Sequence, residues 1–166
     1  MVDVQRNMLE GEQPVPSAAD VKAVFGDLLD KARAARAVVV HVQNDGPPGD
    51  PDEPDTPGWE LFFEPSDDEI VLRKDQCDAF AAAGSLAETL RGRQVDRVVI
   101  AGMQSELCIE ATSRGALAEG FSVALPHGAH ATYDGEQSAA EIASGVEAAL
   151  ESEGVDVVGL SEVVFD

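Results

Sequence analysis

RVVIAGMQSELCIEATSRGALAEGFSVAL, residues 97–125, is the stretch that decides the fold. It begins with a β-branched run at 97–101, continues with a helical run at 109–119 and ends with a second apolar run at 121–125. A strand, a crossover helix and a second strand form a unit whose two strands run parallel. The first turn of such a helix lies at the carboxyl edge of the sheet, where α/β proteins bind ligands.

The same alternation extends through the rest of the chain. Further strands are predicted at 1–5, 38–42, 69–72 and 155–158, and helices at 17–36 (with Ser17 as N-cap), 79–92, 107–119 and 137–152. Strands that alternate with helices indicate a parallel sheet covered on both faces. We therefore predict an α/β fold, a Rossmann-like three-layer α/β/α sandwich with a mainly parallel sheet of about six strands.

The first strand has a special place in this prediction. It is expected to be short and central, flanked by the strands that contain Val40 and Val99, with a loop following at 7–16. We found no internal repeat and no second-domain boundary, so residues 1–166 are expected to form a single domain.

Charge limits the possible partners. The chain has 32 Asp and Glu against 11 Lys and Arg, a formal net charge of −21. Such a surface repels phosphate backbones and anionic lipids, so nucleic acid and membrane are not expected partners. No apolar run approaches the roughly 20 residues of a membrane-spanning helix, and the first residues do not resemble a signal peptide. We expect a cytoplasmic protein.

Residues 45–69 interrupt the alternation with ten acidic residues, six prolines and no lysine or arginine. A long loop in a compact domain is functional or disordered. Its second half holds the only tryptophan, Trp59, beside Phe62 and Phe63, so we expect the first half to be exposed and the second half to be packed. The apolar material at 56–63 also predicts a homo-oligomer, because a small monomer seldom exposes so much.

Three chemically capable residues lie where strands end. Cys108 opens the helix at 107–119, where free N–H groups and the helix dipole favour a thiolate. Lys74 ends the strand at 69–72, and Asp3 lies in the short first strand. Each has an ordinary alternative, since Cys108 can be a core cysteine and Lys74 a surface lysine. Together they would place an acid–base pair around a nucleophile.

Motifs around these residues resemble the isochorismatase-like cysteine hydrolase family, which includes nicotinamidases and carbamoylsarcosine amidohydrolases. VDVQRNM at 2–8 is similar to the family opening "I-D-M-Q-N-D-F", and VLRK at 71–74, followed by DAF at 78–80, resembles "v-x-K … s-A-F". GMQSELCIEAT at 102–112 is similar to "G-x-x-T-x-x-C-V-x-A-T". Pro57–Glu60, PGWE, also resembles a family stretch, and the resemblance runs along the whole chain in order.

The resemblance implies a catalytic triad of Asp3 as general base, Lys74 as its cationic partner and Cys108 as nucleophile. It implies a small amide, carbamoyl or ureido substrate that is cleaved at a C–N bond through a thioester. The backbone N–H groups of Gln104 and Cys108 are expected to form the oxyanion hole, with a cis peptide at Met103–Gln104 directing the Gln104 N–H inward. The substrate pocket is expected to include Met8, Trp59, Gln104, Leu107 and His130.

Departures from the family pattern reduce the number of family reactions that we expect this protein to catalyse. The motif threonine is Ser105, and Asn44-Asp45 stands where many members have His-Asp. Nicotinamidases of this family bind a metal through histidines beside the catalytic site. No histidine lies between His41 and His127 here, so we predict that this protein, unlike the nicotinamidases, uses no metal and no cofactor. Five carboxylates of the loop are expected to be solvated: Asp45, Asp50, Asp52, Glu53 and Asp55. Isochorismatases that cleave a vinyl ether lack the cysteine, so Cys108 argues against that reaction.

Two other classes of function stay open. A catalytically idle binding or scaffold protein could keep the fold. The short first strand is the feature that favours this class most, because a short strand anchors Asp3 poorly. A thiol redox protein could use Cys77 together with Cys108. Cys77 lies between carboxylates that disfavour its reactivity, so we interpret it as incidental.

Overall fold

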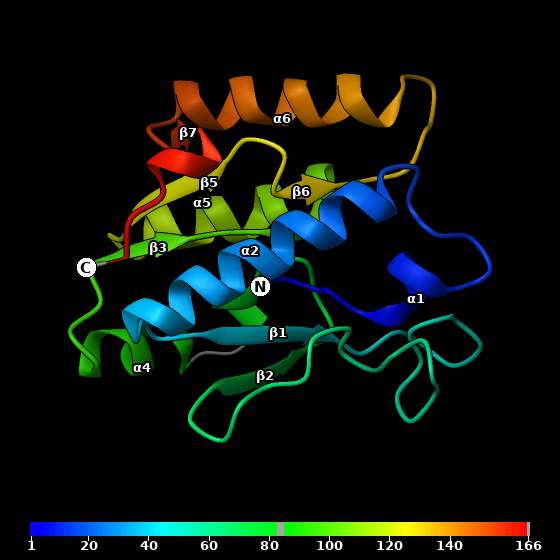
Figure 1. Cartoon of the computed structure of the whole chain (residues 1–166), viewed down its shortest axis with the longest axis horizontal. Helices are drawn as coiled ribbons and strands as arrows, with labels where there is room; N and C mark the ends of the chain where they lie inside the picture. The colour runs from blue at the N-terminus through cyan, green and yellow to red at the C-terminus, as the bar shows by residue number, and fades with distance from the viewer. Residues whose placement is uncertain (83–84, 166) are drawn as a thin grey trace.

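The computed structural model describes residues 1–82 and 85–165, which form an α/β fold (Figure 1). The strands are β1 (Val40–Asn44), β2 (Ile70–Lys74), β3 (Arg97–Val99), β4 (Gly102–Met103), β5 (Ser122–Pro126), β6 (His130–Ala131) and β7 (Asp156–Val158). The helices are α1 (Arg6–Glu10), α2 (Ala18–Ala35), α3 (Ala79–Ala82), α4 (Leu86–Gly92), α5 (Glu110–Ala118) and α6 (Ala139–Ser152), with a π-helical turn η1 (Ser105–Ile109) and a 3-10 turn η2 (Leu160–Glu162).

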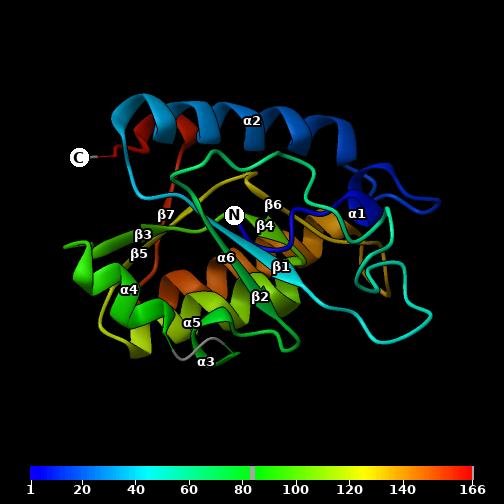
Figure 2. The ribbon, with the colours of Figure 1, turned by 90° about the horizontal axis from the view of Figure 1, so that it is seen from below.

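The strands pair in parallel, as the alternation of strands and helices predicts. β1 pairs with β2, β3 with β5, β5 with β7, and β4 with β6. Figure 2 shows α2 on one face of these strands and α5 and α6 on the other. The predicted α/β class with mainly parallel pairing is therefore confirmed.

Val2 joins the two halves of the sheet. It forms parallel bridges to Val42 of β1 and to Gly102 of β4, so the start of the chain is central, as predicted. The predicted strand at 1–5 is nevertheless reduced to isolated bridges. Asp3 has a φ of 51°, in the left-handed region, and this conformation ends the extended run one residue after Val2.

Each face of the sheet has its own hydrophobic core. On one face α2 buries Val21, Phe25 and Leu28 against Val4, Ala101 and Met103. On the other face α3, α4, α5 and α6 bury Phe80, Leu90, Ala116 and Leu150 against Val42, Val123 and Leu125. A strand that is buried on both sides can be apolar at successive positions, which explains the continuous β-branched runs in the sequence.

Several helix boundaries differ from the prediction. The helix expected at 79–92 is found as α3 and α4, and residues 83–84 between them lie outside the described residues. The helical segment expected from 107 begins earlier, as the π-helical turn η1. The loop expected at 7–16 contains most of α1, because Met8 and Leu9 turn inward and are buried. Ser17 precedes α2, but its side chain makes no capping hydrogen bond.

The acidic loop at 45–69 follows the expected division only in part, because residues 52–54 of the first half are half-buried and residues 66–68 of the second half are exposed. Residues 47–51 are exposed, whereas Phe62 and Phe63 are half-buried against the α2 core and pack edge to face with ring centroids 4.9 Å apart. Because these aromatic rings are partly covered within the chain, they no longer argue strongly for self-association, and the homo-oligomer stays a prediction. Among the described residues, no helix has both the length and the apolarity to traverse a bilayer.

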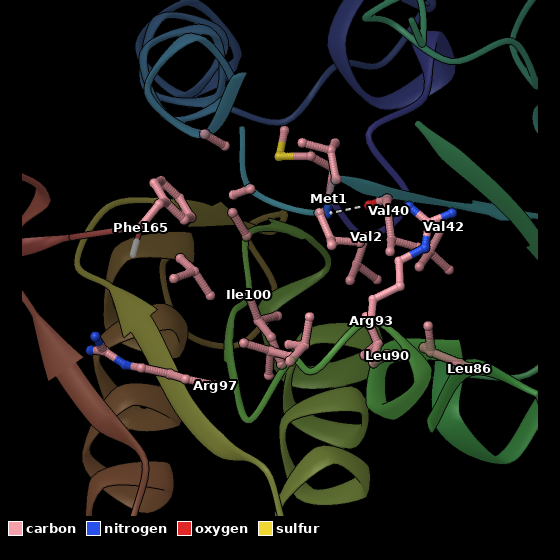
Figure 3. A pocket seen from close by; sticks show the side chains of 18 of the residues that line it. Met1, Val2, Val40, Val42, Leu86, Leu90, Arg93, Arg97, Ile100 and Phe165 are labelled. Carbon is pink, nitrogen blue, oxygen red and sulfur yellow. Dashed lines mark hydrogen bonds between the residues drawn. The ribbon is translucent and has the colours of Figure 1, made fainter. Parts of the chain in front are cut away.

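An apolar cavity of about 360 Å³ lies at the amino ends of β1 and β3 (Figure 3). Met1, Val2, Val40, Ile100 and Phe165 are among its lining residues, and the Met1 amine donates a hydrogen bond of 2.9 Å to the Val40 carbonyl. The strand ends that carry Asn44 and Lys74 lie at the opposite edge of the sheet. The cavity is therefore separate from Asn44 and Lys74, which lie at the carboxyl edge.

Candidate active site

Asp3, Lys74 and Cys108 meet at the carboxyl edge of the sheet. Lys74 Nζ donates a hydrogen bond of 2.7 Å to Asp3 Oδ2 and another of 3.3 Å to Cys108 Sγ. Asp3 and Lys74 are each only 3% exposed, while Cys108 is half-buried. The structure thus brings together the three residues that the sequence singles out, with the ammonium between the carboxylate and the sulfur.

The backbone explains how each side chain reaches this place. Lys74 is the last residue of β2, so its side chain leaves the sheet at the carboxyl edge. Asp3 follows the Val2 bridge, and its N–H donates to the Val42 carbonyl at 2.9 Å. Cys108 lies in η1, which connects β4 to α5. The three segments come from distant parts of the sequence and meet only because the strands are parallel.

Asn44 is a fourth member that sequence reasoning missed. Its Oδ1 accepts a hydrogen bond of 3.1 Å from Lys74 Nζ, and its Nδ2 donates to Asp52 at 2.8 Å. In the β1–β2 register Asn44 is directly opposite Lys74. The sequence places Asn44 at the end of a predicted strand, as it does Lys74. It does not show that these two strands are neighbours, which is what brings the two side chains together.

Burial controls the protonation of the site. It raises the pKa of Asp3, an effect that the Lys74 ammonium partly offsets. For Lys74, burial alone would lower the pKa, but the Asp3 carboxylate and the sulfur outweigh it and raise the pKa. Burial, followed by the nearby Asp3 carboxylate, also raises the pKa of the Cys108 thiol well above its usual value, and Lys74 opposes this only in part.

Burial and the Asp3 carboxylate thus both favour the neutral form of the Cys108 thiol, beside the Asp3–Lys74 ion pair. The helix N-terminus alone would lower the pKa of this thiol, but desolvation and the Asp3 carboxylate act in the opposite direction. Asp3 Oδ1 is buried and has no hydrogen-bond partner within residues 1–82 and 85–165. The Asp3 carboxylate nevertheless lies close enough to the Cys108 thiol for the two side chains to interact, so it is suited to accept the thiol proton.

Gln104, with its backbone N–H donor, immediately precedes η1, the turn that carries Cys108. The Met103–Gln104 peptide bond is cis. The Gln104 carbonyl accepts from the N–H groups of Leu107 and Ile109, whereas its own N–H finds no acceptor in the described part of the chain. A backbone N–H without a partner, four residues before Cys108, is available to a developing oxyanion.

A groove opens beside Lys74. It is lined by Asp45, Pro47, Arg73, Lys74, Asp75 and Ala82. Trp59, a predicted pocket residue, reaches this rim, because its Nε1 donates to Asp45 Oδ1 at 2.9 Å and its ring lies under the Arg73 guanidinium.

The other predicted pocket residues have different positions. Met8 is buried, with its sulfur 4.0 Å from Gln104 Nε2, and Leu107 is exposed. His130 is buried behind the turn that carries Cys108, and its place in the pocket stays a prediction. Its side chain is fully buried, with one ring nitrogen bonded to Ser105 and the other to Glu147, so the imidazole has no free edge for a substrate.

The donor set does not fit a metal site of the imidazole type. Within the part of the chain that the structure describes, no group of three or more His, Cys, Asp or Glu side chains is arranged to hold a metal ion. His41 bonds to Glu69, and His127 and His130 both bond to Glu147. All three imidazoles are thus bonded to glutamate side chains, and metal independence stays a prediction.

The two cysteines are both free thiols, and Cys77 is exposed. Cys108 has its hydrogen bond with Lys74. Neither observation favours a redox pair over the alternative in which Cys108 reacts and Cys77 has no role.

Comparison with known proteins gives the context for this geometry. The family model described as "Isochorismatase domain" matches residues 1–155. A streptothricin hydrolase from Streptomyces noursei is 47% identical over 154 residues, which cover 92% of this chain and 55% of that protein. The chain therefore spans about half the length of the curated relatives it matches.

Solved structures share the fold over nearly the whole chain. An isochorismatase from Pseudomonas putida KT2440 superimposes with a TM-score of 0.90 at 25% identity, covering 99% of this chain and 88% of that one. A pyrazinamidase from Pyrococcus horikoshii, solved in complex with zinc, gives a TM-score of 0.82 at 25% identity and covers 96% of each chain.

Proposed function

This chain belongs to the isochorismatase family, and on that basis we propose that it is a cysteine hydrolase that cleaves a C–N bond of a small amide, carbamoyl or ureido compound. The observation that carries the proposal is the bridging position of Lys74, whose ammonium bonds to both Asp3 and Cys108. Burying an ion pair costs desolvation free energy, and such pairs are typical of functional sites. A pair beside a thiol can assist proton transfer from that thiol.

In the first half of the reaction, Asp3 accepts the Cys108 proton as the sulfur attacks the substrate carbonyl. Lys74 remains charged and stabilises the sulfur as negative charge develops on it. The carbonyl oxygen becomes an oxyanion, which the backbone N–H groups of Gln104 and Cys108 stabilise. The protonated Asp3 then gives its proton to the leaving nitrogen, which departs as ammonia or an amine and leaves a thioester on Cys108.

In the second half, water replaces the departed amine. The water oxygen attacks the thioester carbonyl, and Asp3, again a carboxylate, accepts a proton from that water. The same two N–H groups stabilise the second oxyanion. Collapse of this intermediate breaks the C–S bond, the proton returns from Asp3 to the sulfur, and the acid product leaves with the thiol restored.

The relatives suggest where a substrate search begins. Two curated matches from Streptomyces noursei are named streptothricin hydrolase, with identities of 48% and 47%. Streptothricin is therefore the first compound to test, followed by a panel of small primary amides, carbamoyl compounds and ureides. The partner implied by this function is a small molecule, and no step of the mechanism uses a cofactor.

The test is the release of ammonia or amine by purified protein across this panel. We expect turnover of at least one compound by the wild type and none by Cys108→Ala. A wild type that reacts stoichiometrically with iodoacetamide at Cys108 but releases nothing from any compound would favour the idle binding protein. Reversible formation of a Cys77–Cys108 disulfide without hydrolysis would favour the redox protein.

A further inference from the structure

A row of buried polar side chains lies directly behind the turn that carries Cys108. His130 Nδ1 is 2.8 Å from Ser105 Oγ, and His130 Nε2 is 3.1 Å from Glu147 Oε1. The Ser105 residue and the His130 side chain are completely buried, and Glu147 of α6 is 12% exposed at its side chain. His127, whose side chain is exposed, bonds through Nδ1 to both carboxylate oxygens of Glu147, at 2.9 and 2.8 Å.

The direction of these hydrogen bonds follows from their chemistry. An ionised Glu147 only accepts, so His130 Nε2 and His127 Nδ1 both donate to it. A neutral His130 that is protonated at Nε2 has a bare Nδ1, which accepts the hydroxyl proton of Ser105. Burial keeps His130 neutral by lowering its pKa, although Glu147 acts in the opposite direction. Glu147 thus selects the tautomer of His130 that is protonated at Nε2, and this tautomer sets the direction in which the Ser105 hydroxyl points.

Ser105 transmits this constraint to the site. It directly follows Gln104, whose N–H lacks an acceptor, and it is the first residue of η1, which carries Cys108. The strands reinforce the link, since His130 of β6 is paired with Gly102 of β4. Next along the chain from β6, Thr132 donates a hydrogen bond of 2.8 Å to Glu106. Residues 102–106 are therefore held in place by the segment around His130.

We propose that His130 is a positioning residue for the hydrolysis: through the Ser105 hydroxyl it holds the Gln104 N–H and the Cys108 turn in their reactive arrangement, and Glu147 holds His130. The inference rests on the proposed function, because it assigns the Gln104 N–H to the oxyanion. Ser105 itself is not a second nucleophile. Its hydroxyl is inaccessible, and its proton points to an imidazole that is committed to Glu147.

Two pairs of variants separate positioning from simple packing. Ser105→Ala removes the hydroxyl and Ser105→Thr keeps it, while His130→Leu removes the acceptor and His130→Asn can keep one near the Nδ1 position. Ser113→Ala is the matched control, because Ser113 is equally buried and its hydroxyl has no partner within the described residues. Each variant is assayed for kcat and KM with the compound that the wild type turns over best, and for its melting temperature.

We expect Ser105→Ala and His130→Leu to lower kcat by roughly 100-fold with little change in KM, as a small misplacement of reacting groups does. Ser105→Thr, His130→Asn and Ser113→Ala should stay within a few-fold of the wild type. The inference is overturned if Ser105→Ala retains its kcat, or if kcat falls in Ser113→Ala or in the conservative variants as much as in Ser105→Ala. Should His130→Leu fail to fold, the serine series alone decides.

A second readout distinguishes this inference from the proposed function. The rate at which iodoacetamide labels Cys108, measured at about pH 9, depends on the contact of the sulfur with Lys74 and needs no substrate. If the wild type turns over no compound, the proposed function fails. The positioning of the Cys108 turn is then judged by labelling, which should slow several-fold in Ser105→Ala and His130→Leu but not in Ser113→Ala. Equal labelling rates in all variants would overturn it.

Discussion

Lys74 Nζ lies 2.7 Å from Asp3 Oδ2, and this buried ion pair joins the end of β2 to the start of the chain. The two residues are 71 positions apart in sequence, and each is only 3% exposed. Removal of one partner leaves the other charge buried and unpaired, which is usually far more costly than the pair itself is stabilising. A substitution in this pair is therefore expected to change both the free energy of unfolding and the reactivity of Cys108.

Lys74→Met should destabilise the protein by about 3–5 kcal/mol, because Asp3 is left without its cation. The double variant Asp3→Leu with Lys74→Met should recover much of this loss and remain inactive. Urea unfolding measures the stabilities, with Lys31→Met, an exposed lysine of α2, as the control. If the single and double variants are equally unstable, burial of an unpaired charge is not the cause.

The labelling rate of Cys108 should keep rising with pH beyond neutrality. Burial and Asp3 raise the thiol pKa, so the reactive thiolate is scarce at neutral pH and increases as the solution becomes more alkaline. Iodoacetamide labelling followed by peptide mass spectrometry gives the profile, and the exposed Cys77 is an internal comparison in the same chain. A Cys108 rate that is already maximal at neutral pH would show a stabilised thiolate instead.

Asn44→Asp should slow the labelling of Cys108, by about tenfold for each unit that the thiol pKa rises further. The new carboxylate would lie about 3 Å from Lys74 Nζ, where it competes with the sulfur for the ammonium. Gln137→Glu adds the same charge at an exposed position and serves as the control. Equal rates in the two variants would mean that Asn44 has no influence on the nucleophile.

Much of this arrangement could be predicted from sequence. The β-branched runs indicated parallel strands, and the carboxyl edge of a parallel sheet collects residues such as Lys74 and Cys108. The sequence did not reveal Asn44, whose role depends on which strands are neighbours. The position at a helix N-terminus suggested a lowered pKa for Cys108, whereas burial and the nearby Asp3 carboxylate, which depend on the three-dimensional structure, raise it. The sequence likewise does not show that β6 pairs with β4 and that the imidazole of His130, which was expected to line the pocket, is bonded to Ser105 and Glu147.

Acid should weaken the protein partly through Glu69. Arg33 and the backbone N–H of Ser66 bond to this carboxylate, as does His41, and together they lower the pKa of Glu69 to about 2. A carboxylate with a lowered pKa contributes stability above its ordinary value of 4.5, and this is lost as the pH falls toward 2. Burial lowers the pKa of His41, so the neutral imidazole adds stability that is lost as the pH falls below 6.5.

Glu69→Gln should therefore cost about 2 kcal/mol at neutral pH, as expected for hydrogen bonds to a charged group. The difference from the wild type should shrink as the pH decreases below about 4, where the native carboxylate begins to lose its advantage. Glu151→Gln, at an exposed position of α6, is the control. A difference that stays constant across the acid range would mean that the charge on Glu69 does not matter.

The central claim is that Cys108 is the nucleophile of a C–N hydrolase, and the most direct test is a comparison of Cys108→Ala with Cys77→Ala. Both variants lose one thiol, but only Cys108 contacts Lys74. The measurement is the rate of ammonia or amine release from the best compound of the panel. We predict that Cys77→Ala retains the wild-type rate and that Cys108→Ala releases nothing above the uncatalysed background. Turnover that persists in Cys108→Ala would contradict the account.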